Sequence, residues 1–190
     1  MPGSSLWLLP PADHPLNNTL PTLIDETSKQ FKSPHRFLPH VTITSQISPP
    51  LYGSEPQAWL ESLELPSGSS VEVKFEGLGS EEAFLRKLYI KCRKTGGLQN
   101  LGQQCRRKVE GFEEESKANT WAREQYMPHL SLLYHDCPQV DQHDLTSVRT
   151  LDVNTEGVGQ LGGWVGGRVV LVPTDSAIDG WLPVAERVLQ

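Results

Sequence analysis

A six-residue phrase that occurs twice constrains the fold of this 190-residue chain more than any other feature. Residues 38–44 read L-P-H-V-T-I-T, and residues 127–133 read M-P-H-L-S-L-L. Each copy runs apolar, Pro, His, apolar, hydroxyl residue, apolar, which is the period-two alternation of a half-buried β-strand. The sequence therefore predicts two equivalent strands, about ninety residues apart, that one fold must accommodate.

Alternation decides which side chains of these two strands share one face of a sheet. In the first copy, His40 and Thr42 point to one face and the apolar residues beside them to the other. In the second copy, His129 and Ser131 share a face in the same way. Each strand thus offers an imidazole and a hydroxyl side by side. Burying such a pair without a partner costs free energy, so the pairs are expected to line a polar site.

A bare His-x-Ser/Thr match is weak evidence by itself, since six histidines give about one such match by chance. Two matches occur, and both also share the preceding proline and the apolar residues of the phrase. The four remaining histidines give no match: His14, His35, His135 and His143. The repetition is therefore better explained by a shared role than by coincidence.

Hydrophobic periodicity divides the rest of the chain into alternating strands and helices. Strands are expected at residues 5–9, 39–44, 71–76, 87–92, 129–135 and 168–173, and long amphipathic helices at 15–32 and 98–112. Shorter helices are expected at 56–63, 139–149 and 182–189, with a polar, mobile connection at 113–121. Each half of the chain has a long helix followed by a Pro-His strand. This weak duplication predicts an α+β fold with two lobes, each a sheet with a helix on one face.

Composition limits the kinds of ligand that this protein is expected to bind and the cell compartment in which it is expected to lie. The formal net charge of -6 argues against a wide basic surface for long nucleic acid, but it allows a local pocket for a small phosphorylated ligand. The three cysteines have no metal-ligand spacing, and their low, odd number indicates a reducing compartment. No signal peptide or membrane-spanning stretch is visible. We expect a single domain over residues 1–190, monomeric and cytoplasmic, with peripheral endomembrane association as the alternative.

Two imidazoles and two hydroxyls that face one cleft suit in-line displacement at phosphorus. Histidine titrates near neutral pH, so one imidazole can accept a proton while the other gives one. The hydroxyls of Thr42 and Ser131 can donate to the non-bridging phosphate oxygens, where negative charge builds in the transition state. This chemistry needs neither a metal ion nor a cofactor, and none is expected.

In these features the chain resembles the two-histidine (2H) phosphoesterase superfamily, and within it the fungal and plant cyclic phosphodiesterases. The segments SLWLLP, LPHVTIT, RKLYIKC and MPHLSLLY fall in the family's order, and the resemblance is weak after about residue 136. It implies a bilobal fold in which two antiparallel sheets with outer helices surround a central cleft with pseudo-twofold symmetry. It also implies a phosphodiesterase that converts nucleoside 2',3'-cyclic phosphates to 2'-phosphates. ADP-ribose 1'',2''-cyclic phosphate, a by-product of tRNA splicing, would give ADP-ribose 1''-phosphate.

The resemblance also implies roles for individual residues. His129 would activate water, and His40 would protonate the departing ribose oxygen. Thr42 and Ser131 would hold the phosphate, and Tyr134 matches an aromatic residue of the family. Judged from their residue type alone, Trp7 and Tyr134 are candidates to stack on a base or on the nicotinamide ribose, with packing in the core or at its rim as the alternative. Strict strand alternation, however, predicts that Tyr134 faces away from His129.

Two alternative functions stay open at the level of sequence. One is a related phosphoesterase that processes RNA ends, of the 2',5' or 3' exonuclease type, which the acidic balance of the chain disfavours. The other is a non-catalytic nucleotide-binding module. The presence of both histidines and both hydroxyl residues argues against it, because binding alone has no need of two acid/base groups.

Overall fold

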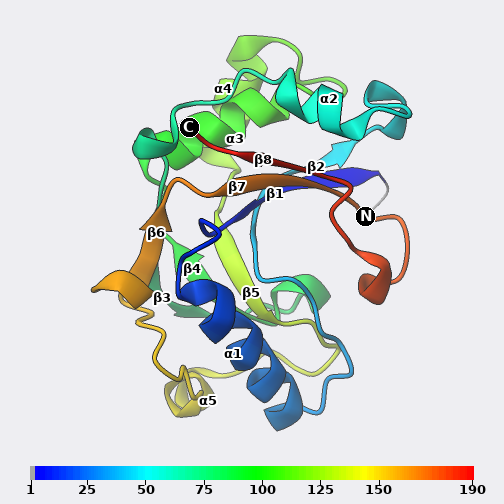
Figure 1. Cartoon of the computed structure of the whole chain (residues 1–190). Coiled ribbons are helices and arrows are strands. Elements are labelled where there is room, and N and C mark those ends of the chain that lie inside the picture. Colours follow the sequence, from blue (N-terminus) through cyan, green and yellow to red (C-terminus); the bar gives the residue numbers. More distant parts are fainter. Residues whose placement is uncertain (1–2) are drawn as a thin grey trace.

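Eight strands form one curled antiparallel sheet in residues 3–190, the part of the chain that this computed structural model describes (Figure 1). The strands are β1 (Ser4–Leu9), β2 (Val41–Ile47), β3 (Glu72–Gly79), β4 (Leu88–Cys92), β5 (His129–Leu133), β6 (Gly163–Val165), β7 (Arg168–Pro173) and β8 (Ala185–Val188). Their order across the sheet is β6-β3-β4-β5-β2-β1-β7-β8. The two Pro-His strands, β2 and β5, are therefore neighbours at the centre.

The continuity of this sheet corrects the expectation of two separate sheets. β2 and β5 pair antiparallel at Val41 and Leu130, which joins the strands of the two halves into one sheet. The physical reason lies in the backbone, because two separate sheets would leave unpaired N–H and C=O groups along both inner edges. The α+β class is confirmed.

The two long helices, α1 (Leu16–Gln30) and α3 (Gly96–Arg106), supply the main core. Both bury apolar residues at helical spacing: Leu16, Leu20, Leu23 and Ile24 on α1, and Leu98, Leu101 and Cys105 on α3. Burial of one such leucine or isoleucine side chain contributes about 1.5–3 kcal/mol. α1 contacts β5 and α3 contacts β2, so each long helix packs on the Pro-His strand of the other half.

Three shorter α-helices and five single 3-10 turns complete the secondary structure of residues 3–190. The helices are α2 (Pro56–Glu61), α4 (Glu115–Glu124) and α5 (Gln142–Ser147). The turns are η1 (Pro49–Leu51), η2 (Gly68–Ser70), η3 (Phe84–Arg86), η4 (Gln160–Gly162) and η5 (Ile178–Gly180). No helix within this part of the chain is both long enough and apolar enough to cross a lipid bilayer.

Two predicted elements are wrong. The polar connection expected at 113–121 contains α4, whose buried residues Ala118 and Ala122 are too small to give a strong hydrophobic pattern but allow close packing on α3. The helix expected at 182–189 is an edge strand, because β8 pairs with β7 from Arg168 opposite Val188 to Leu171 opposite Ala185. A partner strand from elsewhere in the fold decided this conformation over local propensity.

A second, smaller apolar cluster lies apart from the main core. Its buried members are Trp7, Leu9, Tyr134, Val170, Val172 and Trp181. They come from β1, from β7, and from the residues after β5 and η5, so they lie beside β2 and β5.

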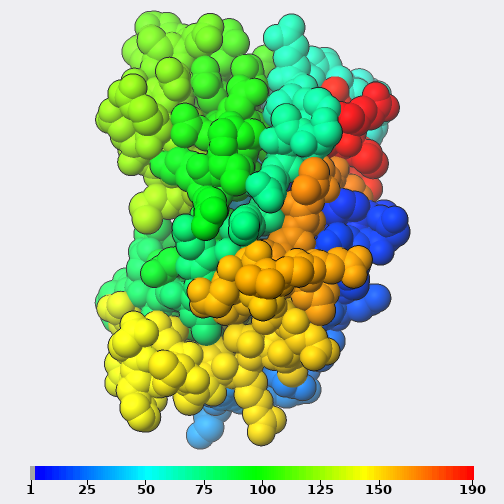
Figure 2. Space-filling model, turned by 90° about the vertical axis from the view of Figure 1, so that its left-hand side faces the viewer, coloured from blue at the N-terminus to red at the C-terminus, as the bar shows by residue number. Residues whose placement is uncertain are grey.

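In Figure 2, which shows the molecule from another side, the α5 region (yellow) lies below the strands β3 and β4 (green).

Candidate active site

The pairing of β2 with β5 brings the two Pro-His phrases together. The residues that join the strands are those that follow the histidines, Val41 and Leu130. One step along the antiparallel register from this pair, His40 lies opposite Ser131. One step in the other direction, His129 lies opposite Thr42. Since opposite residues share a face, both imidazoles and both hydroxyls lie on the face away from α1 and α3.

A hydrogen bond to the backbone orients each imidazole in the same way. His40 Nδ1 lies 2.6 Å from the carbonyl oxygen of Leu38, and His129 Nδ1 lies 2.9 Å from that of Met127. In both cases the acceptor is two residues upstream, across the proline, whose fixed φ angle limits the direction of that carbonyl. A neutral imidazole that donates through Nδ1 carries its lone pair on Nε2, which is the form that a general base requires.

The His40 side chain is buried and almost closed to solvent. It is 6% exposed, and the Trp7 ring stacks on it with centroids 3.6 Å apart and planes 6° from parallel. Burial lowers the pKa of His40 to about 3, against an opposing contribution from the hydrogen bond to Leu38. A charge on His129 would lower this pKa further, which means that the two imidazoles interact electrostatically. In the free protein His40 is therefore neutral at pH 7.

The surroundings of His129 are more open and more polar. Burial lowers the pKa of His129, and the charge of Arg86 lowers it further, while Met127 and Glu81 act in the opposite direction. The Tyr89 ring meets the imidazole edge to face, with centroids 5.3 Å apart. The Tyr89 hydroxyl donates to Glu81 Oε1 at 2.9 Å, and Arg86 pairs with the same carboxylate at 2.8 Å. This network fixes the phenol ring beside His129.

The two hydroxyl side chains differ in their bonding. The Ser131 hydroxyl is buried and donates to the carbonyl oxygen of Leu85 at 2.8 Å. Thr42 is half-buried, and its carbonyl oxygen, rather than its hydroxyl, accepts the Tyr126 hydroxyl at 3.2 Å. For the Ser131 hydroxyl to donate to a bound phosphate, it therefore has to rotate and give up its hydrogen bond to the Leu85 carbonyl oxygen.

Tyr134 does not face away from the site as strict alternation predicts. Between Ser131 and Leu133, two steps on β5 correspond to one step on β4, which is a β-bulge. Leu132 and Leu133 consequently both point into the main core. Tyr134 then emerges on the other face, in the cluster that contains Trp7.

Trp7 and Tyr134, the possible substrate contacts, are both nearly inaccessible in this structure. Trp7 is 2% exposed and Tyr134 is 3% exposed. Trp7 packs on His40, and Tyr134 stacks on Phe37 with ring centroids 3.7 Å apart. Both rings form the apolar wall behind His40 and face away from solvent.

Sequence reasoning missed the contribution of β4. The β4–β5 register places Tyr89 opposite Ser131 and Lys91 opposite His129, so both β4 residues share the face of the site. His129 borders a cavity of about 320 Å³ whose lining includes the cations Arg86, Lys91 and Lys94. The alternation of residues 88–92 predicts a strand and shows which of its side chains share a face. It does not reveal that this strand pairs with β5.

One group of side chains among residues 3–190 could hold a metal ion. Asp141, His143 and Asp144 place one potential ligand atom each within 4.8 Å of one another, and all three are exposed. They belong to the α5 region rather than to the strands that carry His40 and His129. This group is thus separate from the imidazole and hydroxyl side chains that lie between β2 and β5.

Comparison with known proteins agrees with this arrangement. A profile of the family described as "Cyclic phosphodiesterase-like protein" matches residues 1–189. The chain is 62% identical to a 2',3'-cyclic-nucleotide 3'-phosphodiesterase of Phaeosphaeria nodorum over 193 residues, with all of both chains covered. It is 38% identical to a protein of that name from Neurospora crassa, again with full coverage, and 27% identical to one from Saccharomyces cerevisiae over 76% of this chain and 70% of the relative. This chain belongs to the cyclic phosphodiesterase-like protein family.

Proposed function

We propose that this protein hydrolyses nucleoside 2',3'-cyclic phosphates to nucleoside 2'-phosphates without a metal ion. The observation that carries the proposal is the antiparallel pairing of β2 with β5 at Val41 and Leu130, the residues that follow the two histidines. It supports a register in which each imidazole lies opposite the hydroxyl residue of the other strand. The relatives at 62% and 38% identity are named for a phosphodiesterase of this class. The duplicated phrase then supplies the two acid/base groups that one displacement at phosphorus requires.

The reaction is an in-line attack of water on phosphorus. As the new P–O bond forms, Nε2 of His129 accepts a proton from the attacking water. The bond from phosphorus to the ribose 3'-oxygen breaks, and this oxygen takes a proton from His40. The hydroxyls of Thr42 and Ser131 donate to the non-bridging oxygens, where charge builds in the transition state. One water is consumed, and the products are a 2'-phosphate and a free 3'-hydroxyl.

The unequal exposure of the two imidazoles supports this division of roles. His129 borders an open cavity, so water can reach its free nitrogen. His40 lies beneath Trp7 and is closed to bulk water, which suits a group that meets only the leaving oxygen of a bound substrate.

The lowered pKa values have a consequence for the acid. Both imidazoles are neutral at pH 7 in the free protein, because burial lowers both pKa values. A general acid, however, must carry a proton. The anionic phosphodiester next to His40 favours the imidazolium form, so the substrate itself raises the fraction of protein in the reactive protonation state.

We extend the proposal to ADP-ribose 1'',2''-cyclic phosphate, which would yield ADP-ribose 1''-phosphate and would link the protein to by-products of tRNA splicing. This compound carries the same kind of five-membered cyclic phosphate on a ribose, so the same four groups can act on it. The order of strands supports two half-sites related by a pseudo-twofold axis with a cleft between them. Next to β5 lies β4, and next to β2 lies β1, so each Pro-His strand is flanked by the strand that precedes it in the sequence.

The test is a product assay with adenosine 2',3'-cyclic phosphate, followed by phosphorus NMR, with and without EDTA. The expected product is adenosine 2'-phosphate, at the same rate in EDTA. The double variant His40→Ala/His129→Ala is the control for a contaminating enzyme. A 3'-phosphate product, or loss in EDTA with recovery on addition of a divalent ion, would contradict the proposal. Turnover of 2',5'-linked or 3'-terminal RNA alone would favour the RNA-end alternative.

A further inference from the structure

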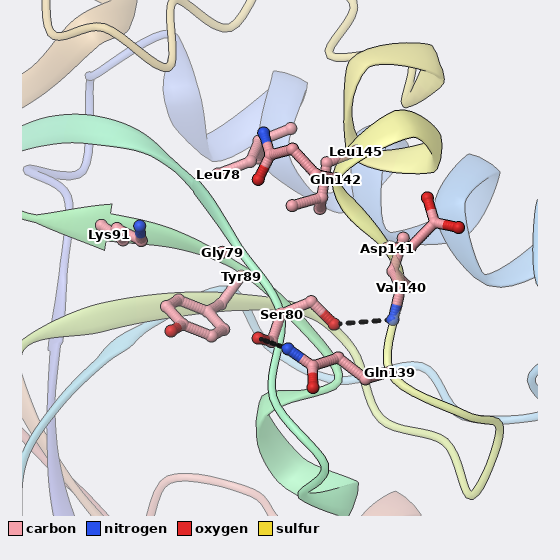
Figure 3. A pocket seen from close by; sticks show the side chains of 10 residues that line it. All are labelled: Leu78, Gly79, Ser80, Tyr89, Lys91, Gln139, Val140, Asp141, Gln142 and Leu145. Atoms are coloured by element: carbon pink, nitrogen blue, oxygen red, sulfur yellow. Dashed lines mark hydrogen bonds between the residues drawn. The ribbon is translucent and has the colours of Figure 1, made fainter.

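A second cavity, of about 410 Å³, adjoins the cavity of His129. Figure 3 shows it between β4, which contributes Tyr89 and Lys91, and the α5 region, which contributes Asp141 just before the helix and Leu145 within it. Tyr89 and Lys91 line both cavities. A molecule with one end at His129 can therefore continue across these two side chains into the second cavity.

Lys91 is the cation that the two cavities share. It lies directly opposite His129 in the β4–β5 ladder, and its side chain is exposed. Opposite side chains in an antiparallel pair have Cβ atoms about 5 Å apart, so the Lys91 ammonium can reach a group next to a phosphate bound at His129. Arg86 already pairs with the Glu81 carboxylate, whereas Lys91 forms no salt bridge within residues 3–190. Lys91 is thus available to an anion.

Gly79 on β3 makes room for the wall that the cavities share. A Cβ atom at position 79 would lie 2.7 Å from the Tyr89 ring and 2.9 Å from Cε of Lys91. Both distances are too short for a stable contact, so any larger residue at this position would displace the two side chains. Glycine therefore lets the Tyr89 ring and the Lys91 stem lie against β3, in the position where they line both cavities.

Hydrogen bonds to Ser80, the residue that follows β3, hold the opposite wall in place. The Gln139 side-chain amide donates to the carbonyl oxygen of Ser80 at 2.8 Å, and the Val140 backbone N–H donates to the Ser80 hydroxyl at 2.9 Å (Figure 3). Further along this wall, the exposed amide of Gln142 and the half-buried side chain of Leu145 line the cavity. The cavity therefore combines amide groups with apolar surface, as sites for planar organic ligands do.

We propose that this second cavity binds the nucleoside portion of a substrate whose cyclic phosphate lies between His40 and His129, and that Lys91 binds a further phosphate linked to the 5'-oxygen. The proposal rests on the function proposed above and deepens it, because it names a nucleotide with a second phosphate as the preferred substrate. Ammonium to phosphate is a charge-assisted interaction, and the amide and apolar groups beyond it suit a base.

The kinetic test compares adenosine 2',3'-cyclic phosphate with the same compound carrying a 5'-phosphate. We expect kcat/KM to be about tenfold higher for the 5'-phosphorylated substrate, the scale of one hydrogen bond to a charged group. Lys91→Gln should remove this preference by neutralising the cation, and Gln142→Trp should reduce it by filling the cavity. Lys108→Gln, the same charge change at an exposed position on another part of the surface, is the matched control and should keep the preference.

A binding measurement separates this proposal from the proposed function. Calorimetry with adenosine 5'-diphosphate, which has no cyclic phosphate to react, should show binding to the unmodified protein and about tenfold weaker binding to Lys91→Gln. If neither cyclic phosphate is hydrolysed but this pattern appears, the function fails and the nucleotide site stands. If hydrolysis occurs with equal kcat/KM for both substrates, or with a preference that neither variant changes, the function stands and the subsite is wrong.

Discussion

The two Pro-His strands have the same local geometry but different surroundings. In β2 and in β5, the histidine Nδ1 bonds to the carbonyl two residues upstream, across a proline. His40 is nevertheless covered by Trp7, whereas His129 borders a cavity with three cations in its lining. The short phrase thus fixes the orientation of the imidazole, and the tertiary structure fixes its proton affinity and its access to water. Two copies of one phrase can in this way perform two different steps.

The largest expected effect on turnover comes from removing either of the two histidines. His40→Ala and His129→Ala should each lower turnover of adenosine 2',3'-cyclic phosphate about 10²-fold or more, because each variant loses one proton-transfer group. Steady-state kinetics with the two purified variants measures this. Near-normal turnover by either one would mean that the site needs only one of its halves.

The two hydroxyl residues should separate activity from stability. Thr42→Val keeps the shape of the side chain and removes only the hydroxyl, so we expect at least about a tenfold loss of kcat with little change in stability. Ser131→Ala should also lower kcat. It should in addition lower the free energy of unfolding by about 1 kcal/mol, because the Leu85 carbonyl loses its donor. Kinetics and urea unfolding of both variants give the comparison, and equal stability losses would contradict it.

The pH dependence of stability should be dominated by His40. The unfolded chain protonates this residue below its ordinary pKa of 6.5, but the folded protein does so only near pH 3. The unfolded state therefore binds more protons in this window, and the folded state loses stability as the pH falls from 6.5. His40→Gln should make this decline shallower, by at most about 1.4 kcal/mol per pH unit. Urea unfolding at pH 7.0, 5.5 and 4.5 measures the decline, with His129→Gln as the counterpart that should change it less. An unchanged decline in His40→Gln would show that other groups cause it.

The smallest expected effect concerns only the His129 half. Tyr89→Phe removes the hydroxyl that donates to Glu81 but keeps the ring against the imidazole. We expect a loss of kcat of a few fold at most, with about 1 kcal/mol of stability lost with the hydrogen bond. NMR titration should show a changed pKa for His129 and an unchanged pKa for His40. A change in both would mean that Tyr89 acts on the site as a whole.

The sequence predicts the parts of this fold that depend on local patterns. Strong alternation in residues 39–44 and 129–135 places β2 and β5, although β5 already ends at Leu133. The apolar sides of these strands, Val41 and Leu130, lie in the core. Leucines at helical spacing place α1 and α3. Each of these signals lies within one element, so no knowledge of neighbouring strands is needed to read it.

The parts that could not be predicted depend on pairing between distant segments. The β2–β5 joint makes one sheet out of two predicted ones, and β8 takes its conformation from β7. The bulge after Ser131 moves Tyr134 to the other face. Lys91 becomes a neighbour of His129 only through the β4–β5 register. None of these relations leaves a period in the sequence, so they appear only in three dimensions.

The division of labour between the two halves is most directly tested with a substrate whose leaving group needs no proton. In a 2',3'-cyclic nucleotide with sulfur in place of the 3'-oxygen, the thiolate departs without help from a general acid. If His40 is the acid and His129 the base, His40→Ala should lose about 10²-fold or more on the oxygen substrate but regain most of that rate on the sulfur substrate. His129→Ala should stay slow on both. Rescue of His129→Ala instead, or of neither variant, would contradict this division.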